Sequence, residues 1–231
     1  MHFSVKNSKL NDPGAPNKIL EWLTKKLRDA RKGNLKVFLI YHIPHGEYVA
    51  SFGTQRYWVP KYEEQLKLLL KEYKDIIATI FTGHLHVSAF NVIKDKSDNE
   101  YYGGVIINRA VSPLFGNNPG FTIYYYGDSM EYPEKYEEFA FLLSDTYNNT
   151  ESPSKYWVHL NTDMEDWQPK SLQAKDIAQF LDDIMRDCSK MFKYTLHRLG
   201  KLSDDSNLAM KVIETLCSET ITNKKIYEMC V

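Results

Sequence analysis

The stretches LKVFLIYHIPHG at residues 35–46 and IIATIFTGHLH at residues 76–86 decide the fold. Each begins with a short apolar run that contains β-branched residues, and each run leads directly into histidines. Short, continuous apolar runs bounded by turn signals are typical of strands buried on both faces of a sheet. We therefore expect buried strands at residues 35–41 and 76–81, each followed by a histidine-bearing loop.

Helical patterns alternate with these strands. Apolar residues recur at helical spacing between residues 19 and 27, and Asn17 and Gly33 are the expected start and stop signals. A second amphipathic helix is expected at residues 61–74. This alternation predicts an α/β layered sheet, with an antiparallel part where the connections are short. The remaining expected strands cover residues 89–93, 103–110 and 120–126.

The chain after about residue 134 is expected to be mostly helical. Residues 171–197 predict one long helix, and residues 207–217 predict a shorter one. These helices are expected to pack on the sheet, and a helical partner-binding face is the alternative. The apolar stripe of the long helix consists of Leu172, Ile177, Phe180, Leu181, Ile184 and Met185.

Composition excludes several classes of protein. The 231 residues carry a net charge of −1, which gives no electrostatic footprint for a nucleic-acid polymer. No apolar run reaches the roughly 18 residues that a transmembrane helix needs. Residues 1–14 have neither the apolar core nor the cleavage site of a signal peptide.

The spacing of the cysteines matches neither a metal-binding nor a redox motif. Cys188, Cys217 and Cys230 show no C-x-x-C spacing, which excludes a zinc ribbon or a thioredoxin motif. Their odd number allows at most one internal pair, and three buried free thiols are the alternative.

Four of the seven histidines, namely His42, His45, His84 and His86, follow the two predicted buried strands. Ligands of open α/β sheets bind beyond the carboxyl ends of strands, so these positions favour a functional site. Residues i and i+2 of an extended segment point the same way, so we expect His84 and His86 to face one site together. His2, His159 and His197 lack this context and are interpreted as surface or packing residues.

Three segments, HIPHG (42–46), GHLHVSAF (83–90) and SPLFGNNPGF (112–121), carry a family resemblance. The first is similar to the His-Ile-Pro-Pro-Gly loop of acid sphingomyelinases and sphingomyelinase-like phosphodiesterases. The second resembles the Gly-His-Thr-His motif of calcineurin-like metallophosphoesterases, and the third resembles a segment of the sphingomyelinase branch. The resemblance runs in order from about residue 12 to residue 230.

The resemblance implies a fold and a division of the chain. Residues 1–132 would be the C-terminal half of a four-layered α/β/β/α metallophosphoesterase sandwich, and residues 133–231 a helical C-terminal subdomain. It also implies metal-dependent phosphodiester hydrolysis of sphingomyelin or of nucleotide phosphoesters. His42 and His84 would bind one ion and His86 a second, with zinc as the expected metal and other divalent ions as alternatives.

The chain departs from the family pattern at three positions. His45 replaces a proline and is expected to be a solvated loop residue, with substrate contact or proton donation as the alternative. Leu85 replaces a threonine and is expected to point away without harm. Ser88 stands where an aspartate is common, so a carboxylate that supports the site is lost.

The family's Asp-x-His, Gly-Asp-x-x-Asp and Gly-Asn-His-Glu motifs do not occur in the sequence. Three neutral imidazoles do not offset the repulsion between two close cations, so about half a site is expected. The metal site would then need a missing N-terminal segment or a complementing chain. The alternatives are a truncated, non-catalytic homologue that acts as a binding protein, and a mononuclear zinc protein.

The resemblance also implies a secreted or lysosomal glycoprotein. Cys217 and Cys230 match a C-terminal disulfide of the family, which would leave Cys188 free. Asn148 opens a glycosylation sequon with Thr150.

Overall fold

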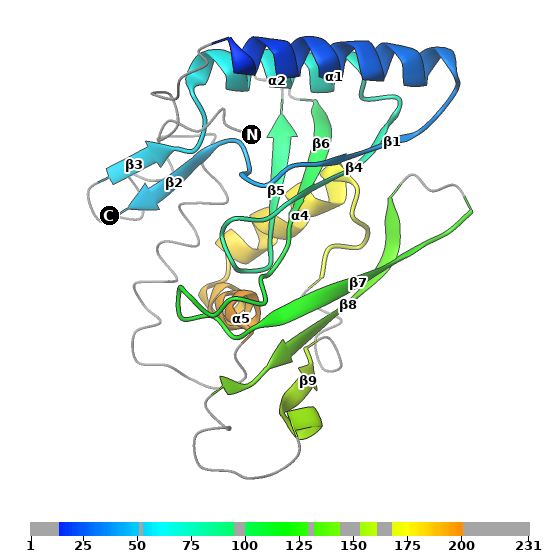
Figure 1. The fold of residues 1–231 in the computed structure, drawn as a ribbon. Coiled ribbons are helices and arrows are strands. Elements are labelled where there is room, and N and C mark those ends of the chain that lie inside the picture. Colours follow the sequence, from blue (N-terminus) through cyan, green and yellow to red (C-terminus); the bar gives the residue numbers. More distant parts are fainter. Residues whose placement is uncertain are drawn as a thin grey trace.

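In the described part of the chain, helices and three small sheets build the fold (Figure 1). The computed structural model describes residues 14–50, 53–94, 100–128, 132–143, 153–160 and 168–200. The helices are α1 (Ala15–Lys32), α2 (Pro60–Glu72), α4 (Ala174–Met185) and α5 (Cys188–Leu199), with a 3-10 turn at Pro153–Tyr156. The strands are β1 (Val37–Ile40), β2 (Glu47–Ala50), β3 (Gly53–Arg56), β4 (Ile77–Thr82), β5 (Ala89–Lys94), β6 (Tyr101–Ile107), β7 (Gly120–Tyr126), β8 (Pro133–Phe141) and β9 (Trp157–His159).

A four-stranded sheet with the order β1-β4-β6-β5 carries the histidine loops. Strands β1, β4 and β6 are parallel, and β5 runs antiparallel to β6, which confirms the expected mixed sheet. Helices α1 and α2 cover one face through an apolar cluster that includes Leu20, Leu66, Leu70 and Ile80. This arrangement confirms the α/β prediction for the described residues between 14 and 128.

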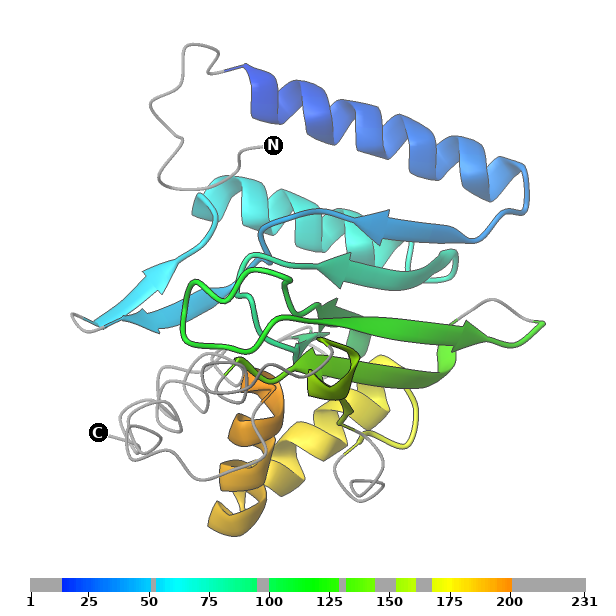
Figure 2. The same ribbon diagram turned by 60° about the horizontal axis from the view of Figure 1, so that its bottom comes forward.

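The opposite face of this sheet is covered by two different structures (Figure 2). Helix α4 packs against β5 and β6 around Ile177, which is fully buried. The antiparallel sheet β7-β8-β9 lies over β1 and β4, where the Tyr124 ring meets Phe81 with ring centres 5.0 Å apart. The layers are therefore helices, sheet, and then a second sheet together with α4 and α5.

The predicted mostly helical character of the chain after residue 134 is wrong for the described residues between 133 and 159. This region contains β8 and β9, and β8 alternates buried Tyr136, Glu138 and Ala140 with less buried neighbours. The single long helix predicted at residues 171–197 is also wrong, because α4 ends at Met185 and α5 begins at Cys188. The packing of this region on the sheet is confirmed.

Two further local predictions are corrected. Helix α1 begins at Ala15 with Pro16 in its first turn, three residues before the helix start expected from a cap at Asn17. Strand β1 is not buried on both faces, because it is an edge strand on which Phe38 and Ile40 are exposed. The stop at Gly33 and the strand at residues 120–126 are confirmed.

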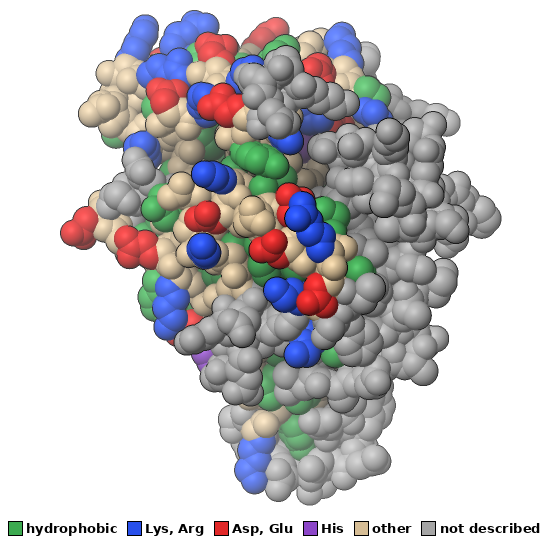
Figure 3. Space-filling view, turned by 180° about the vertical axis from the view of Figure 1, so that it is seen from behind, with side chains coloured by type: hydrophobic (Ala, Val, Ile, Leu, Met, Phe, Trp, Pro, Cys, Tyr) green, Lys and Arg blue, Asp and Glu red, His purple; other side chains and the backbone are tan. Residues whose placement is uncertain are grey.

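Figure 3 shows acidic and basic side chains interspersed over the described part of one face of the molecule. This mixture agrees with the net charge of −1. Within the described ranges, no helix is both long and apolar enough to cross a membrane. The residues His2, Asn148, Cys217 and Cys230, and the helix expected at residues 207–217, lie outside the described part of the chain.

Candidate functional site

The two histidine loops lie side by side at one edge of the four-stranded sheet. His42 follows β1 after Tyr41, and His84 follows β4 after Gly83. The Gly83 amide donates a hydrogen bond to the His42 carbonyl at 2.9 Å, which fastens one loop to the other. The two loops thus meet at the carboxyl ends of the neighbouring parallel strands β1 and β4.

The rings of His42 and His84 are neighbours. Their centres lie 5.2 Å apart and their planes are inclined by 78°. Two imidazoles that share one tetrahedral zinc, with Zn–N distances of about 2 Å, have ring centres roughly 5 Å apart. The spacing of His42 and His84 therefore fits a shared ion. Tyr57 borders the pair, since its ring centre lies 5.8 Å from that of His84.

His86 is placed differently from the expectation. His84 and His86 have φ values of 74° and 64°, so the segment between them is a turn and not extended. The His86 ring packs against Phe115 with ring centres 4.8 Å apart. Among the described residues, no group of three His, Cys, Asp or Glu side chains is arranged to hold an ion. The structure thus brings two of the three predicted ligands together.

The Nδ1 atom of His86 is buried and has no hydrogen-bond partner among the described residues. A buried polar atom without a partner costs free energy. Leu85, between the two histidines, packs against the core cluster under α1 and α2, in agreement with the expectation that it points away.

His45 is a buried residue, and the expectation of a solvated loop histidine is wrong. Only 3% of His45 is exposed, and its Nδ1 lies 2.9 Å from the Tyr41 hydroxyl. Burial lowers the pKa of His45 to about 4, with Glu63 opposing the shift. The ring is therefore neutral above this pH, which does not favour proton donation. Trp58, also buried, fixes the same loop by donating its indole N–H to the Ile43 carbonyl at 2.9 Å.

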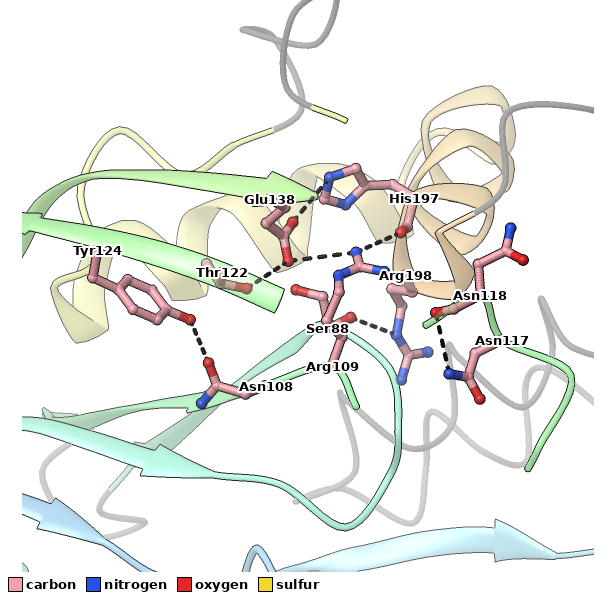
Figure 4. Close-up of polar contacts among 10 residues, drawn as sticks. All are labelled: Ser88, Asn108, Arg109, Asn117, Asn118, Thr122, Tyr124, Glu138, His197 and Arg198. Atoms are coloured by element: carbon pink, nitrogen blue, oxygen red, sulfur yellow. Dashed lines mark hydrogen bonds and ion pairs between the residues drawn. The ribbon is translucent and has the colours of Figure 1, made fainter. Parts of the chain in front are cut away.

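A buried polar network next to this site was not predicted from the sequence (Figure 4). The Arg109 guanidinium donates to the His197 carbonyl at 3.0 Å and lies 3.4 Å from Glu138 Oε1. His197 Nε2 lies 2.9 Å from Glu138 Oε2. The interpretation of His197 as a surface or packing residue therefore misses its contact with Glu138. The alternation of buried residues along β8 is the signal that marks Glu138 as an inward-facing carboxylate.

The network fastens α5 to the strand that follows the His86 loop. Arg198 Nε donates to the Ser88 carbonyl at 3.3 Å, and the Ser88 amide donates to the Arg198 carbonyl at 3.3 Å. Ser88 is buried. At this position, where the family commonly has an aspartate, the backbone of Ser88 binds helix α5. His159 lies apart from the network and stacks on Phe139 with ring centres 4.8 Å apart.

The stability of the chain is expected to decrease as the pH falls, because Glu138 then becomes protonated. Burial alone would raise the pKa of Glu138, but the charges of His197 and Arg109, with hydrogen bonds from His197 and Ser88, outweigh it and lower the pKa from 4.5 to about 2. A depressed carboxylate pKa stabilises the fold above the unfolded pKa and loses this contribution as pH falls. We expect the free energy of unfolding to drop between about pH 5 and pH 2, by up to about 3 kcal/mol from this group.

Urea denaturation across this pH range measures the effect. Glu138→Gln removes the titrating group and should flatten the pH dependence. An equally steep loss in the Glu138→Gln variant would show that other carboxylates cause it.

No family model matches this chain. It is similar to the cyclic GMP-AMP phosphodiesterase SMPDL3A of Bos taurus, with 28% identity over 84% of this chain and 44% of that protein. The protein of the same name from Mus musculus is 30% identical over 72% of this chain and 40% of that protein.

A sphingomyelin phosphodiesterase of Homo sapiens is 27% identical over 46% of this chain and 15% of its own length. The chain therefore spans less than half the length of these curated relatives. The resemblance found in the three sequence segments is confirmed by these similarities. The chain is thus a relative of the sphingomyelinase-like phosphodiesterases, and it corresponds to the C-terminal part of these proteins.

Proposed function

We propose that this chain provides the histidine half of a metal-dependent phosphodiesterase site. The observation that carries the proposal is the closeness of His42 and His84, whose ring centres lie 5.2 Å apart. They lie at the edge of the sheet where the two histidine loops meet. The names of the relatives support the same class of reaction, since they are phosphodiesterases of cyclic GMP-AMP and of sphingomyelin.

His42 and His84 would hold one ion, and His86 a second one. Imidazole nitrogen is a ligand that zinc prefers, and the partnerless Nδ1 of His86 supports a role for this side chain in binding. When bound, the ions would act as Lewis acids toward the phosphoryl group and would lower the pKa of water at the site. The other divalent metals remain alternatives.

The residues around the histidines would position the ligands and the substrate. The half-buried Tyr41 and the buried His45 and Trp58 hold the loop that carries His42. Tyr57 and Phe115 border His84 and His86, so aromatic faces would lie beside the bound phosphoester. The substrate would be a sphingolipid or a nucleotide phosphoester, and a secreted or lysosomal location goes with this proposal.

The histidines alone do not complete a two-metal site, because two close cations need a bridging carboxylate. We therefore expect hydrolysis when this chain is joined to the carboxylate-bearing upstream part of a relative, such as that of Bos taurus. The assay measures zinc-dependent hydrolysis of bis(p-nitrophenyl) phosphate, cyclic GMP-AMP and sphingomyelin.

In this joined protein, His42→Ala and His84→Ala should each lower kcat/KM by about 100-fold or more. His159→Ala is the matched control, because His159 is a stacked histidine on β9 and should leave hydrolysis unchanged. Hydrolysis that survives both ligand substitutions, or that needs no divalent metal, would contradict the proposal.

A further inference from the structure

Helix α5 ends against the residues that follow the His86 turn (Figure 4). The last carbonyl groups of a helix lack partners within the helix and need donors from elsewhere. The Arg109 guanidinium donates to the His197 carbonyl at 3.0 Å. The Ser88 amide donates to the Arg198 carbonyl at 3.3 Å. Both donors come from outside the helix, so the carbonyl groups at the end of α5 bind it to the rest of the fold.

A third residue, Asn118, completes this end of the helix. It donates its backbone amide to the Leu199 carbonyl and its side-chain amide to the Gly200 carbonyl, both at 2.8 Å. Gly200 has a φ of 68°, and a Cβ there would lie 2.8 Å from Arg109 Nη1. The glycine therefore ends the helix and also leaves room for the arginine.

Ser88 links this helix end to the His86 turn. It stands two residues after His86, and its carbonyl accepts a hydrogen bond from Arg198 Nε at 3.3 Å. Both backbone groups of Ser88 therefore bind the same residue of α5. On the turn itself, the His86 carbonyl accepts from the Ala110 amide at 3.5 Å, which is long for a hydrogen bond. The two contacts with α5 are shorter, so they are the stronger support of this segment.

The pair His42 and His84 is held in a different way. The Gly83 amide donates to the His42 carbonyl at 2.9 Å, and the strands that precede both histidines pair in parallel. These hydrogen bonds belong to the sheet and not to α5. A change at the end of α5 should therefore reach His86 and leave the pair in place.

A buried carboxylate stabilises Ser88 from the side of β8. Glu138 accepts a hydrogen bond from the Ser88 hydroxyl, and its carboxylate also faces Arg109 and His197. A hydrogen bond to a charged acceptor is roughly twice as strong as one between neutral groups. Ser88 stands where the family commonly has an aspartate, so in this chain the carboxylate at this place comes from Glu138.

We propose that the end of α5 and the Glu138 carboxylate position His86 for metal binding, because they hold Ser88. Ser88, Arg198 and Glu138 are positioning residues, since they act on His86 through the backbone that follows it. The role of the metal rests on the proposed phosphodiesterase function, whereas the support of the turn rests on the contacts of Ser88. The sheet thus holds the histidine pair, and α5 holds His86.

Hydrogen exchange of the metal-free full chain tests the support of the turn. Arg198→Met removes the donor to the Ser88 carbonyl and keeps a long apolar stem. Arg28→Met is the matched control, because Arg28 is an exposed residue of α1. We expect the Ser88 and Ala110 amides to exchange at least about tenfold faster in Arg198→Met, while the Gly83 amide is unchanged.

Two results of this experiment would overturn the proposal. Equal acceleration of all three amides would mean that Arg198 only stabilises the fold as a whole. Unchanged exchange of the Ser88 and Ala110 amides would mean that α5 does not hold the turn.

Metal content separates positioning from stability. When the chain is joined to the upstream part of the Bos taurus relative, wild type and Arg28→Met should both retain their zinc after dialysis. Arg198→Met should bind the ion at His86 at least about tenfold more weakly, and it should lower kcat far more than it changes KM. Loss of both ions, or of neither, would contradict the proposal. Absence of zinc from the joined wild type would contradict the proposed function, and the exchange rates would still decide the support of the turn.

A second set of variants tests the carboxylate. Glu138→Gln removes the charge beside Ser88, and the Ala110 amide should again exchange at least about tenfold faster. Adding Ser88→Asp to Glu138→Gln returns a carboxylate to the same place, so exchange should slow toward that of wild type. Ser88→Asp alone places two carboxylates side by side and should not slow exchange. A double variant that exchanges as fast as Glu138→Gln would overturn the role of Glu138.

Discussion

Replacing Glu138 by alanine should lower the free energy of unfolding by about 3–5 kcal/mol. The Glu138 side chain is 1% exposed and faces Arg109 and His197. Removing one partner of a buried ion pair leaves the opposite charge buried without compensation, which costs more than the pair contributes. Arg109 is the residue most affected, because its Nε and Nη1 already have no hydrogen-bond partner among the described residues.

Urea denaturation of wild type and variant at neutral pH measures this loss. Glu137→Ala is the control, because Glu137 directly precedes Glu138 on β8 and its partners, Lys135 and Tyr125, lie on the exposed side of the strand. The Glu137→Ala variant should be clearly less destabilised than Glu138→Ala. Equal losses in both variants would show that the buried network does not stabilise the fold.

Replacing Gly120 by alanine should destabilise the chain by about 3 kcal/mol, at the upper end of the usual cost of overpacking. Gly120 begins β7 opposite Ala140, and an added Cβ would lie 2.3 Å from the Phe139 carbonyl oxygen and 2.4 Å from Arg109 Cδ. The backbone of β8 cannot yield without breaking the β7–β8 ladder. Displacement of Arg109 would also weaken its interaction with Glu138.

Thermal unfolding compares this variant with Gly83→Ala. A Cβ at Gly83 would meet its nearest atom, His42 Nδ1, at 3.7 Å, which is an ordinary contact. Gly83→Ala should therefore be much less destabilising. A stable Gly120→Ala variant would show that β7 and β8 separate at little cost, contrary to this description of the network.

Local sequence patterns predict those elements whose environment is decided by near neighbours. The strand at residues 120–126 agrees with β7, and the helix at residues 61–74 with α2, because each pattern follows the period of its element. The start of α1 is missed because a proline in the first turn, rather than an Asn17 cap, opens the helix. The break between α4 and α5 occurs at Arg186 and Asp187, where no glycine or proline marks it.

The site is predicted where it depends on strand order and is missed where it depends on distant contacts. The meeting of His42 and His84 follows from two strands that end at one edge of a sheet. The burial of His45 depends on Tyr41 and Trp58, and the pairing of Glu138 with His197 joins residues 59 positions apart in the sequence. Neither feature is visible as a local pattern. The apolar run at residues 35–41 is typical of an inner strand, so it predicts burial on both faces. The structure instead places β1 at an exposed edge.

The central claim, that His42 and His84 share a metal ion, is tested most directly by titrating zinc into the full chain and following the heat of binding. We expect wild type and His159→Ala to bind zinc alike, and His42→Ala and His84→Ala to bind it at least about tenfold more weakly. The same affinity and stoichiometry in all four proteins, or no zinc binding by wild type, would contradict the claim.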